Sequence, residues 1–117
     1  MNKDYPSLFG HTVFEVVTGS MSGAIEIDDY VVVKQTKKLK VLDIITFKDN
    51  DNFITHRVVE IRGDKIITRG DANSANDIEI EYEDVVGKVV YRIKGAGVWK
   101  KVFLDYKVMI PIIVTLI

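Results

Sequence analysis

A hairpin signal in the middle of the chain constrains the fold more than any other feature. Residues 53–62 and 65–69 are rich in β-branched and other apolar side chains, and Gly63-Asp64 separates them. Such a dipeptide is typical of the two-residue turn that joins antiparallel strands. A symmetric hairpin centred on this turn places His56 opposite Asp71. Directly opposed side chains have Cβ atoms about 5 Å apart, so this register predicts an imidazole–carboxylate hydrogen bond.

Short strand-like runs, with turn signals at close intervals, cover much of the remaining chain. They lie at 13–17, 24–27, 30–33, 41–47, 78–83 and 85–93, with 78–83 expected at a sheet edge. Polar connections are expected at 28–29, 35–40, 49–52 and 71–77. Residues 98–108 fit a helix and a strand equally badly, and no long run has convincing helical periodicity. We therefore predict one all-β domain of short, mostly antiparallel strands.

Composition limits the classes of function. A chain of 117 residues with 47% hydrophobic residues is long and apolar enough for one domain with a core. Its formal net charge of -1 gives no electrostatic support for nucleic acid as a partner. Absence of cysteine excludes disulfides, thiolate catalysis and cysteine-ligated zinc. The acidic turn at 49–52 lacks the central glycine and distal glutamate of an EF-hand, so we expect no metal and no cofactor.

The segment Thr18-Gly19-Ser20-Met21 directly follows the apolar run 13–17. A glycine beside a serine at a strand end lets the hydroxyl stand clear of the backbone, where a neighbouring base can reach it. Gly-Ser pairs are more often turns than catalytic sites, so the segment alone does not indicate an enzyme. A catalytic interpretation needs a base and an acid elsewhere in the chain.

Four segments in order form a pattern that is more specific than any one of them: Thr18–Met21, Ile54–Val59, Thr68–Asn73 with Asp77, and Val85–Val89. Together they resemble the type I signal peptidase family over about residues 13–99. His56 stands where most bacterial members carry a lysine. This is the pattern of the branch that contains the endoplasmic-reticulum, archaeal and Gram-positive sporulation-associated enzymes. The resemblance implies a small β-domain whose fold is shared with self-cleaving repressor peptidases.

The resemblance implies catalytic roles for four residues. Ser20 matches the nucleophile and His56 matches the general base. Asp71 and Asp77 match the two family aspartates, one of which orients the base. The hairpin register favours Asp71 as the partner of the imidazole, whereas the family pattern slightly favours Asp77 and keeps Asp71 as an essential part of the same box. Both alternatives are open at this point.

The resemblance also implies how substrate binds. The backbone N–H of Ser20 and the hydroxyl of Thr18 match oxyanion donors, and Met21 matches a residue of the pocket for the side chain before the cut. Substrates of the family are secretory precursors that are cleaved after small residues in an Ala-x-Ala-like pattern. The peptide is expected to bind extended beside a strand edge. The expected location is the cell membrane, with the catalytic domain on the extracytoplasmic side.

An apolar run, 108–117, ends the sequence. It is about half of the roughly 20 residues that a membrane-spanning helix needs, so it is interpreted as a terminal strand or as the first turns of an anchor. We therefore assign 1–107 to the catalytic β-domain and 108–117 to a separate apolar segment. Family members carry a membrane helix before the serine-bearing strand, so an anchor is expected to have been trimmed or to begin at 108–117. Membrane lipid is an expected partner, either there or at an interfacial patch of Val98, Trp99, Phe103 and Leu104 beside Lys100 and Lys101. Core packing accounts equally well for these four apolar residues.

Two departures from the family pattern follow the serine. Ser22-Gly23 stands where relatives have Glu-Pro, and the loss of a rigid proline predicts a looser loop. Asp28-Asp29 stands where relatives have Gly-Asp, and aspartate tolerates left-handed backbone better than most residues.

Two alternative functions remain open. One is a non-catalytic domain that binds extended peptides or assists the assembly of secreted subunits. The other is a self-cleaving peptidase of the repressor type, which would need a lysine base, and His56 at that position argues against it.

Overall fold

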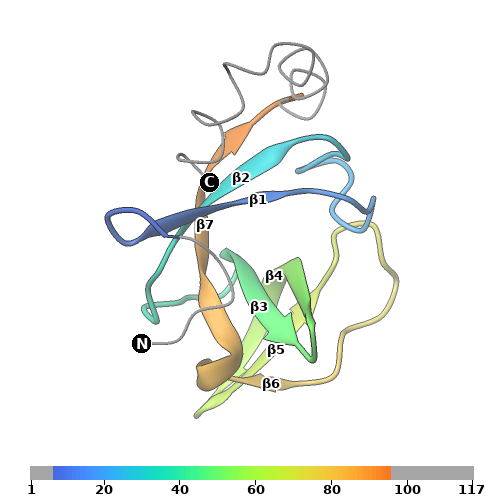
Figure 1. Cartoon of the computed structure of the whole chain (residues 1–117). Helices are drawn as coiled ribbons and strands as arrows, with labels where there is room; N and C mark the ends of the chain where they lie inside the picture. Colours follow the sequence, from blue (N-terminus) through green and yellow to red (C-terminus); the bar gives the residue numbers. More distant parts are fainter. Residues whose placement is uncertain (1–6, 96–117) are drawn as a thin grey trace.

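A single antiparallel sheet forms the described part of the chain, which in this computed structural model comprises residues 7–95 (Figure 1). Its strands are β1 (His11–Glu15), β2 (Tyr30–Lys34), β3 (Ile44–Asp49), β4 (Asn52–Arg62), β5 (Lys65–Arg69), β6 (Ile80–Glu81) and β7 (Val85–Ile93). A short 3-10 helix, η1 (Tyr82–Asp84), precedes β7. The prediction of an all-β domain is confirmed. No helix within 7–95 is long and apolar enough to cross a membrane. The boundary at residue 107, the apolar segment 108–117 and the lipid-facing residues expected near Trp99 lie outside the described residues.

β7 joins the two parts of the sheet. The strand order is β1-β2-β7-β3-β4-β5-β6, so β7, the last strand within residues 7–95, lies between β2 and β3 (Figure 1). Gly87 makes this arrangement possible, because a Cβ at this position would collide with the backbone carbonyl of Lys34. The glycine that interrupts the apolar run at 85–93 is therefore a point of close backbone approach.

The β4–β5 hairpin turns where the sequence predicts and then changes register. Arg62 pairs with Lys65 around the two-residue turn, but a bulge between Val58 and Glu60 shifts the ladder by one residue. Beyond the bulge, Arg57 pairs with Arg69. The prediction that His56 lies opposite Asp71 is therefore wrong, because one extra residue of β4 is accommodated without a partner.

Four other strands also differ from prediction. β1 covers His11–Glu15 instead of residues 13–17. Residues 24–27 form turns because the N–H groups of Ala24 and Ile25 both donate to the carbonyl of Met21. β3 begins at Ile44 instead of residue 41, because a turn that contains Leu42 with a φ of 82° precedes it. Of the predicted edge strand at 78–83, only β6 is extended, and η1 takes up the remainder.

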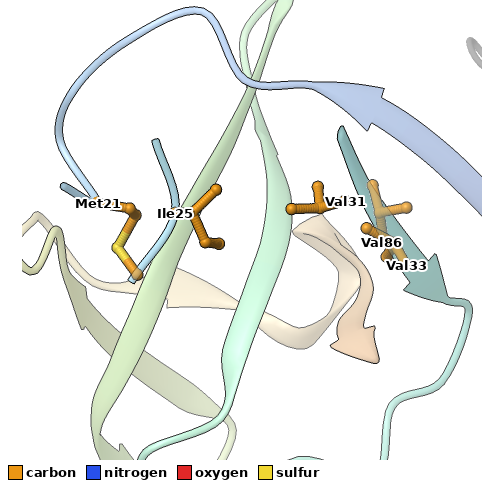
Figure 2. Packing of buried hydrophobic residues seen from close by; sticks show 5 residues of the cluster. All are labelled: Met21, Ile25, Val31, Val33 and Val86. Atoms are coloured by element: carbon orange, nitrogen blue, oxygen red, sulfur yellow. The ribbon is translucent and has the colours of Figure 1, made fainter. Parts of the chain in front are cut away.

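Two hydrophobic clusters stabilise the sheet. The first contains Met21, Ile25, Val31, Val33 and Val86, and Figure 2 shows these five side chains. The second contains Ile45, Phe47, Val58, Ile66 and Val85, which come from β3, β4, β5 and β7. Burial of one such side chain contributes about 1.5–3 kcal/mol before the cost of ordering it. The first cluster holds residues 16–29, the connection from β1 to β2, against the sheet through Met21 and Ile25.

Candidate active site

Ser20 lies in the connection between β1 and β2, named here the nucleophile segment (residues 16–29). The two ends of this segment are closed by hydrogen bonds between Val16 and Asp28 or Asp29, with N···O distances of 2.8–3.0 Å. The carbonyl of Ser20 accepts a hydrogen bond of 2.9 Å from the N–H of Ala72. The backbone of Ser20 is thus tied to the loop that follows β5.

His56 joins this serine to an acid. It lies in β4 and is only 7% exposed. Its Nε2 is 3.0 Å from the Oγ of Ser20, and its Nδ1 is 2.6 Å from Oδ2 of Asp77. Because a carboxylate accepts hydrogen bonds, we assign the Nδ1 proton to the bond with Asp77, which leaves Nε2 free to accept from the serine hydroxyl. This arrangement is that of a serine nucleophile, a general base and an orienting acid.

Asp77 is itself fixed by Thr68 of β5. The hydroxyl of Thr68 donates to Oδ2 of Asp77 at 2.6 Å, and the N–H of Asp77 donates to the carbonyl of Thr68 at 2.8 Å. Thr68 was not among the site residues expected from the sequence. The sequence feature that could have identified Thr68 is a hydroxyl side chain on the strand that pairs with β4, two residues before the Gly70-Asp71 pair.

Asp71 binds a different partner from the one that the predicted hairpin register gives it. Its two carboxylate oxygens accept hydrogen bonds of 2.9 and 2.8 Å from Arg57, whose guanidinium also donates to the carbonyl of Leu42 at 3.0 Å. Hydrogen bonding by Arg57 lowers the pKa of Asp71, and the same bond raises the pKa of Arg57. The N–H of Asp71 also points to the sulfur of Met21 at 3.3 Å. Asp71 thus braces the loop after β5 and contacts the nucleophile segment.

Gly70 allows Ser20 and His56 to approach the loop that follows β5. A Cβ at Gly70 would lie 2.6 Å from the carbonyl oxygen of Ser20, 2.7 Å from Nδ2 of Asn73 and 3.0 Å from Nε2 of His56. Real Cβ atoms do not make contacts under 3.0 Å with backbone, so another residue would displace Ser20. Gly70 lies within the segment that resembles the family, but no role was expected for it from the sequence.

The two remaining predicted site residues flank the serine. The hydroxyl oxygen of Thr18 is 3.2 Å from the Oγ of Ser20. Met21 is 2% exposed and belongs to the first hydrophobic cluster.

A cleft of about 740 Å³ opens beside Ser20, His56, Thr18 and Met21. Apolar side chains from β1, β2, β4 and the nucleophile segment form much of its wall: Phe14, Val16, Ile25, Val31, Phe53 and Ile54. Within residues 7–95, no group of three or more histidine and carboxylate side chains is arranged to hold a metal ion. The geometry therefore combines an apolar cleft with a serine that is hydrogen-bonded to a buried imidazole.

Comparisons with known proteins find signal peptidases. A family model described as signal peptidase, peptidase S26, matches residues 6–96. Signal peptidase I W of Bacillus subtilis (strain 168) is 38% identical over 80 residues, which are 62% of this chain and 42% of that protein. The signal peptidase complex catalytic subunit SEC11 of Verticillium alfalfae is 31% identical over 99 residues, which are 70% of this chain and 58% of that protein. The chain spans about half the length of these curated relatives.

Proposed function

Because the chain belongs to the signal peptidase family, peptidase S26, we propose that it is a serine endopeptidase that removes N-terminal signal peptides from secretory precursors. The observation that carries the proposal is the hydrogen-bonded series from Ser20 through His56 to Asp77, at the side of an apolar cleft. Cleavage after small residues in an Ala-x-Ala-like pattern is part of the proposal, as is action at the outer surface of the membrane.

In the proposed reaction, the Oγ of Ser20 attacks the scissile carbonyl while Nε2 of His56 accepts the hydroxyl proton. Asp77 stabilises the imidazolium that forms, and His56 then gives this proton to the leaving amine. A water molecule, deprotonated by the same imidazole, hydrolyses the acyl-enzyme and restores the serine hydroxyl. The Ser20 N–H and the Thr18 hydroxyl are the proposed donors to the oxyanion. Asp71 supports the loop that contacts Ser20, through its ion pair with Arg57.

The cleft supports binding of an extended peptide. One side of it is formed by the end of β1 and the start of the nucleophile segment, and the other by the first residues of β4. A peptide backbone inserted along these elements would pair as an added strand, with alternate side chains directed into the apolar wall. Met21 is the proposed contact of the small side chain before the cut. Secretory precursors and membrane lipid are the proposed partners. The assignment of 1–107 to the catalytic domain and 108–117 to a separate apolar segment stays a prediction.

The test is cleavage of a fluorogenic Ala-x-Ala peptide in detergent or lipid by the wild-type chain and by Ser20→Ala and His56→Ala. Each substitution removes a group that takes part in bond formation or proton transfer, so each is expected to lower kcat by about 10⁴-fold or more. Equal cleavage by wild type and Ser20→Ala would refute the proposal. Peptide binding without turnover by the wild type would instead favour a non-catalytic peptide-binding domain. Cleavage of the chain itself but not of the peptide would favour the self-cleaving class.

A further inference from the structure

The turn after Ser20 has a backbone that only glycine adopts without strain. Gly23 has a φ of 103°, which proline cannot reach and other L-residues rarely adopt. Hydrogen bonds from the Ser22 N–H to the Gly19 carbonyl and from the Ala24 N–H to the Met21 carbonyl, both of 3.0 Å, fold the chain around it. Because glycine adopts many other conformations equally readily, surrounding contacts are needed to hold the turn in this one.

Glu26 supplies such contacts with a single carboxylate. Its Oε1 accepts a hydrogen bond of 2.8 Å from the hydroxyl of Ser22, and its Oε2 accepts one of 2.7 Å from the N–H of Gly23. The bond from Gly23, followed by that from Ser22, lowers the pKa of Glu26, so the carboxylate stays charged at neutral pH. Both residues that replace the usual Glu-Pro of the family therefore donate to one side chain.

The backbone of Glu26 connects this turn to the sheet. Its N–H donates to Oδ2 of Asp29 at 2.8 Å. Asp29 is 2% exposed, and it also accepts hydrogen bonds from Arg92 at the end of β7 and from the N–H of Gly95. Hydrogen bonds thus connect Ser22 and Gly23, through Glu26 and Asp29, to the end of β7.

Ser20 lies directly before this turn and is held on its other side by the loop after β5. The Ala72 N–H fixes the Ser20 carbonyl, while Glu26 fixes the two residues that follow Met21. Both restraints bear on the 3.0 Å separation between the Oγ of Ser20 and Nε2 of His56. A displacement of about 1 Å in a reacting group is enough to lower a catalytic rate by about 100-fold.

We propose that Glu26 is a positioning residue for the nucleophile, which holds the Ser22-Gly23 turn in the conformation that keeps Ser20 within hydrogen-bond distance of His56. The inference rests on the proposed peptidase function. In this chain, the carboxylate of Glu26 would restrain the turn after Ser20, as a proline would in relatives. The hydroxyl of Ser22 would contribute by its hydrogen bond to this carboxylate.

The experiment compares Glu26→Ala, Glu26→Gln and Ser22→Ala in the full chain. Loss of the carboxylate in Glu26→Ala is expected to lower kcat by about 10- to 100-fold with KM unchanged, because the cleft walls are not altered. Gln has one acceptor oxygen in place of two, so Glu26→Gln should lie between wild type and Glu26→Ala. Ser22→Ala should lower kcat by about threefold in the wild type and have no further effect in the Glu26→Ala background, because the two side chains share one hydrogen bond.

Glu81→Ala is the matched control. Glu81 is also an exposed glutamate that binds a neighbouring side chain, Lys65, but it lies on β6 and does not line the cleft. Its removal should change the melting temperature without lowering kcat. Wild-type kcat in Glu26→Ala, or an equal fall in Glu81→Ala, would overturn the inference.

A second readout separates this inference from the proposed function. The rate at which a serine-reactive fluorophosphonate labels Ser20 needs no peptide substrate, and it should fall by about 10-fold or more in Glu26→Ala. Peptide cleavage by the wild type with unchanged labelling in Glu26→Ala would refute the role of Glu26 and leave the peptidase function intact. Absence of peptide cleavage with reduced labelling in the variant would refute the function and support the positioning role.

Discussion

The two sides of the candidate site are built in different ways. His56 lies on β4, which pairs with β3 on one side and β5 on the other, and Thr68 on β5 fixes its acid. Ser20 lies in the nucleophile segment, whose residues 16–29 contain no strand. This segment is held by Met21 and Ile25 in the first hydrophobic cluster and by the carboxylates of Glu26 and Asp29.

The difference teaches where single substitutions should act. Hydrogen bonds between strands hold the backbone of His56, and most side-chain substitutions leave these bonds intact. The orientation of the imidazole therefore depends mainly on Asp77 and on the close approach at Gly70. The position of Ser20 depends on a few separate side-chain contacts. We expect changes on the base side to act on proton transfer, and changes in the nucleophile segment to act on the placement of Ser20 and on stability.

The largest expected effect is that of Asp77→Asn. The amide removes the charge that stabilises imidazolium, and its NH₂ group can favour the tautomer with the proton on Nε2, so kcat should fall by about 10³- to 10⁴-fold. Asp71→Asn is the matched control in the same loop. It breaks the ion pair with Arg57 and should lower the melting temperature, with a fall in kcat of about 10-fold or less. Steady-state kinetics of both variants measures the two effects. A larger fall in kcat in Asp71→Asn than in Asp77→Asn would show that Asp77 is not the main partner of His56.

Gly70→Ala tests the contact between the two sides. The new Cβ would lie 2.6 Å from the carbonyl oxygen of Ser20, so the nucleophile must shift and kcat should fall by about 100-fold. Gly87→Ala is a contrasting control, because its Cβ collides with the Lys34 backbone in the sheet and should unfold the protein. Circular dichroism should therefore report a folded Gly70→Ala and an unfolded Gly87→Ala. Wild-type kcat in Gly70→Ala would show that Ser20 does not depend on this approach.

The same contrast explains how much the sequence could predict. The regions of β4, β5 and β7 follow from β-branched runs and from the Gly63-Asp64 turn, because local propensity and turn chemistry agree there. The bulge at residue 59 has no comparable local signal. It removes His56 from the register opposite Asp71, so Asp77 binds the imidazole, as the family pattern slightly favoured, and Asp71 binds Arg57.

The nucleophile segment was the least predictable part. Ala24 and Ile25 were expected to be extended, but they form a turn that buries Ile25 beside Met21 (Figure 2). The cluster that buries both side chains includes Val86 of β7, which is distant in sequence, so local propensity does not reveal the turn. The resemblance to a family identified Ser20 and both aspartates as candidates. It gave no indication of Glu26, because the contacts of this residue depend on the Ser22-Gly23 departure from the family pattern.

A smaller effect is expected from Asp29→Asn, on stability. Burial alone would raise the pKa of Asp29, but hydrogen bonds from Glu26, Gly95 and Arg92 outweigh it and leave the pKa below its ordinary value. The ionised group therefore stabilises the fold above about pH 4, and this stability is lost as pH falls through the lower folded-state pKa. At pH 7, Asp29→Asn should lower the free energy of unfolding by about 1.5–3 kcal/mol.

Urea denaturation of wild type and Asp29→Asn at pH 7 and below pH 4 measures this effect. The difference between the two proteins should shrink at the lower pH, because protonation removes the charge from the wild-type side chain. The free energy of unfolding of Asp29→Asn should itself still fall with pH, because the pKa values of Asp71 and Glu26 are also lowered. A constant difference across this range would show that the charge of Asp29 is not what holds the nucleophile segment to β7.

The smallest effect concerns Asp28, which has a φ of 74° at the end of the nucleophile segment. Aspartate adopts this left-handed conformation at lower cost than most L-residues, whereas alanine has no polar side chain to compensate for it. Asp28→Ala should therefore lower the free energy of unfolding by about 1 kcal/mol. Asp28→Gly should stay within about 0.5 kcal/mol of wild type, because relief of the backbone strain is offset by the greater entropy of glycine in the unfolded chain. If kcat stays at the wild-type value in both variants while the free energy of unfolding changes, the conformation of Asp28 does not affect the placement of Ser20. The placement of Ser20 would then depend on the carboxylate of Glu26 more than on the closure of the segment at Asp28.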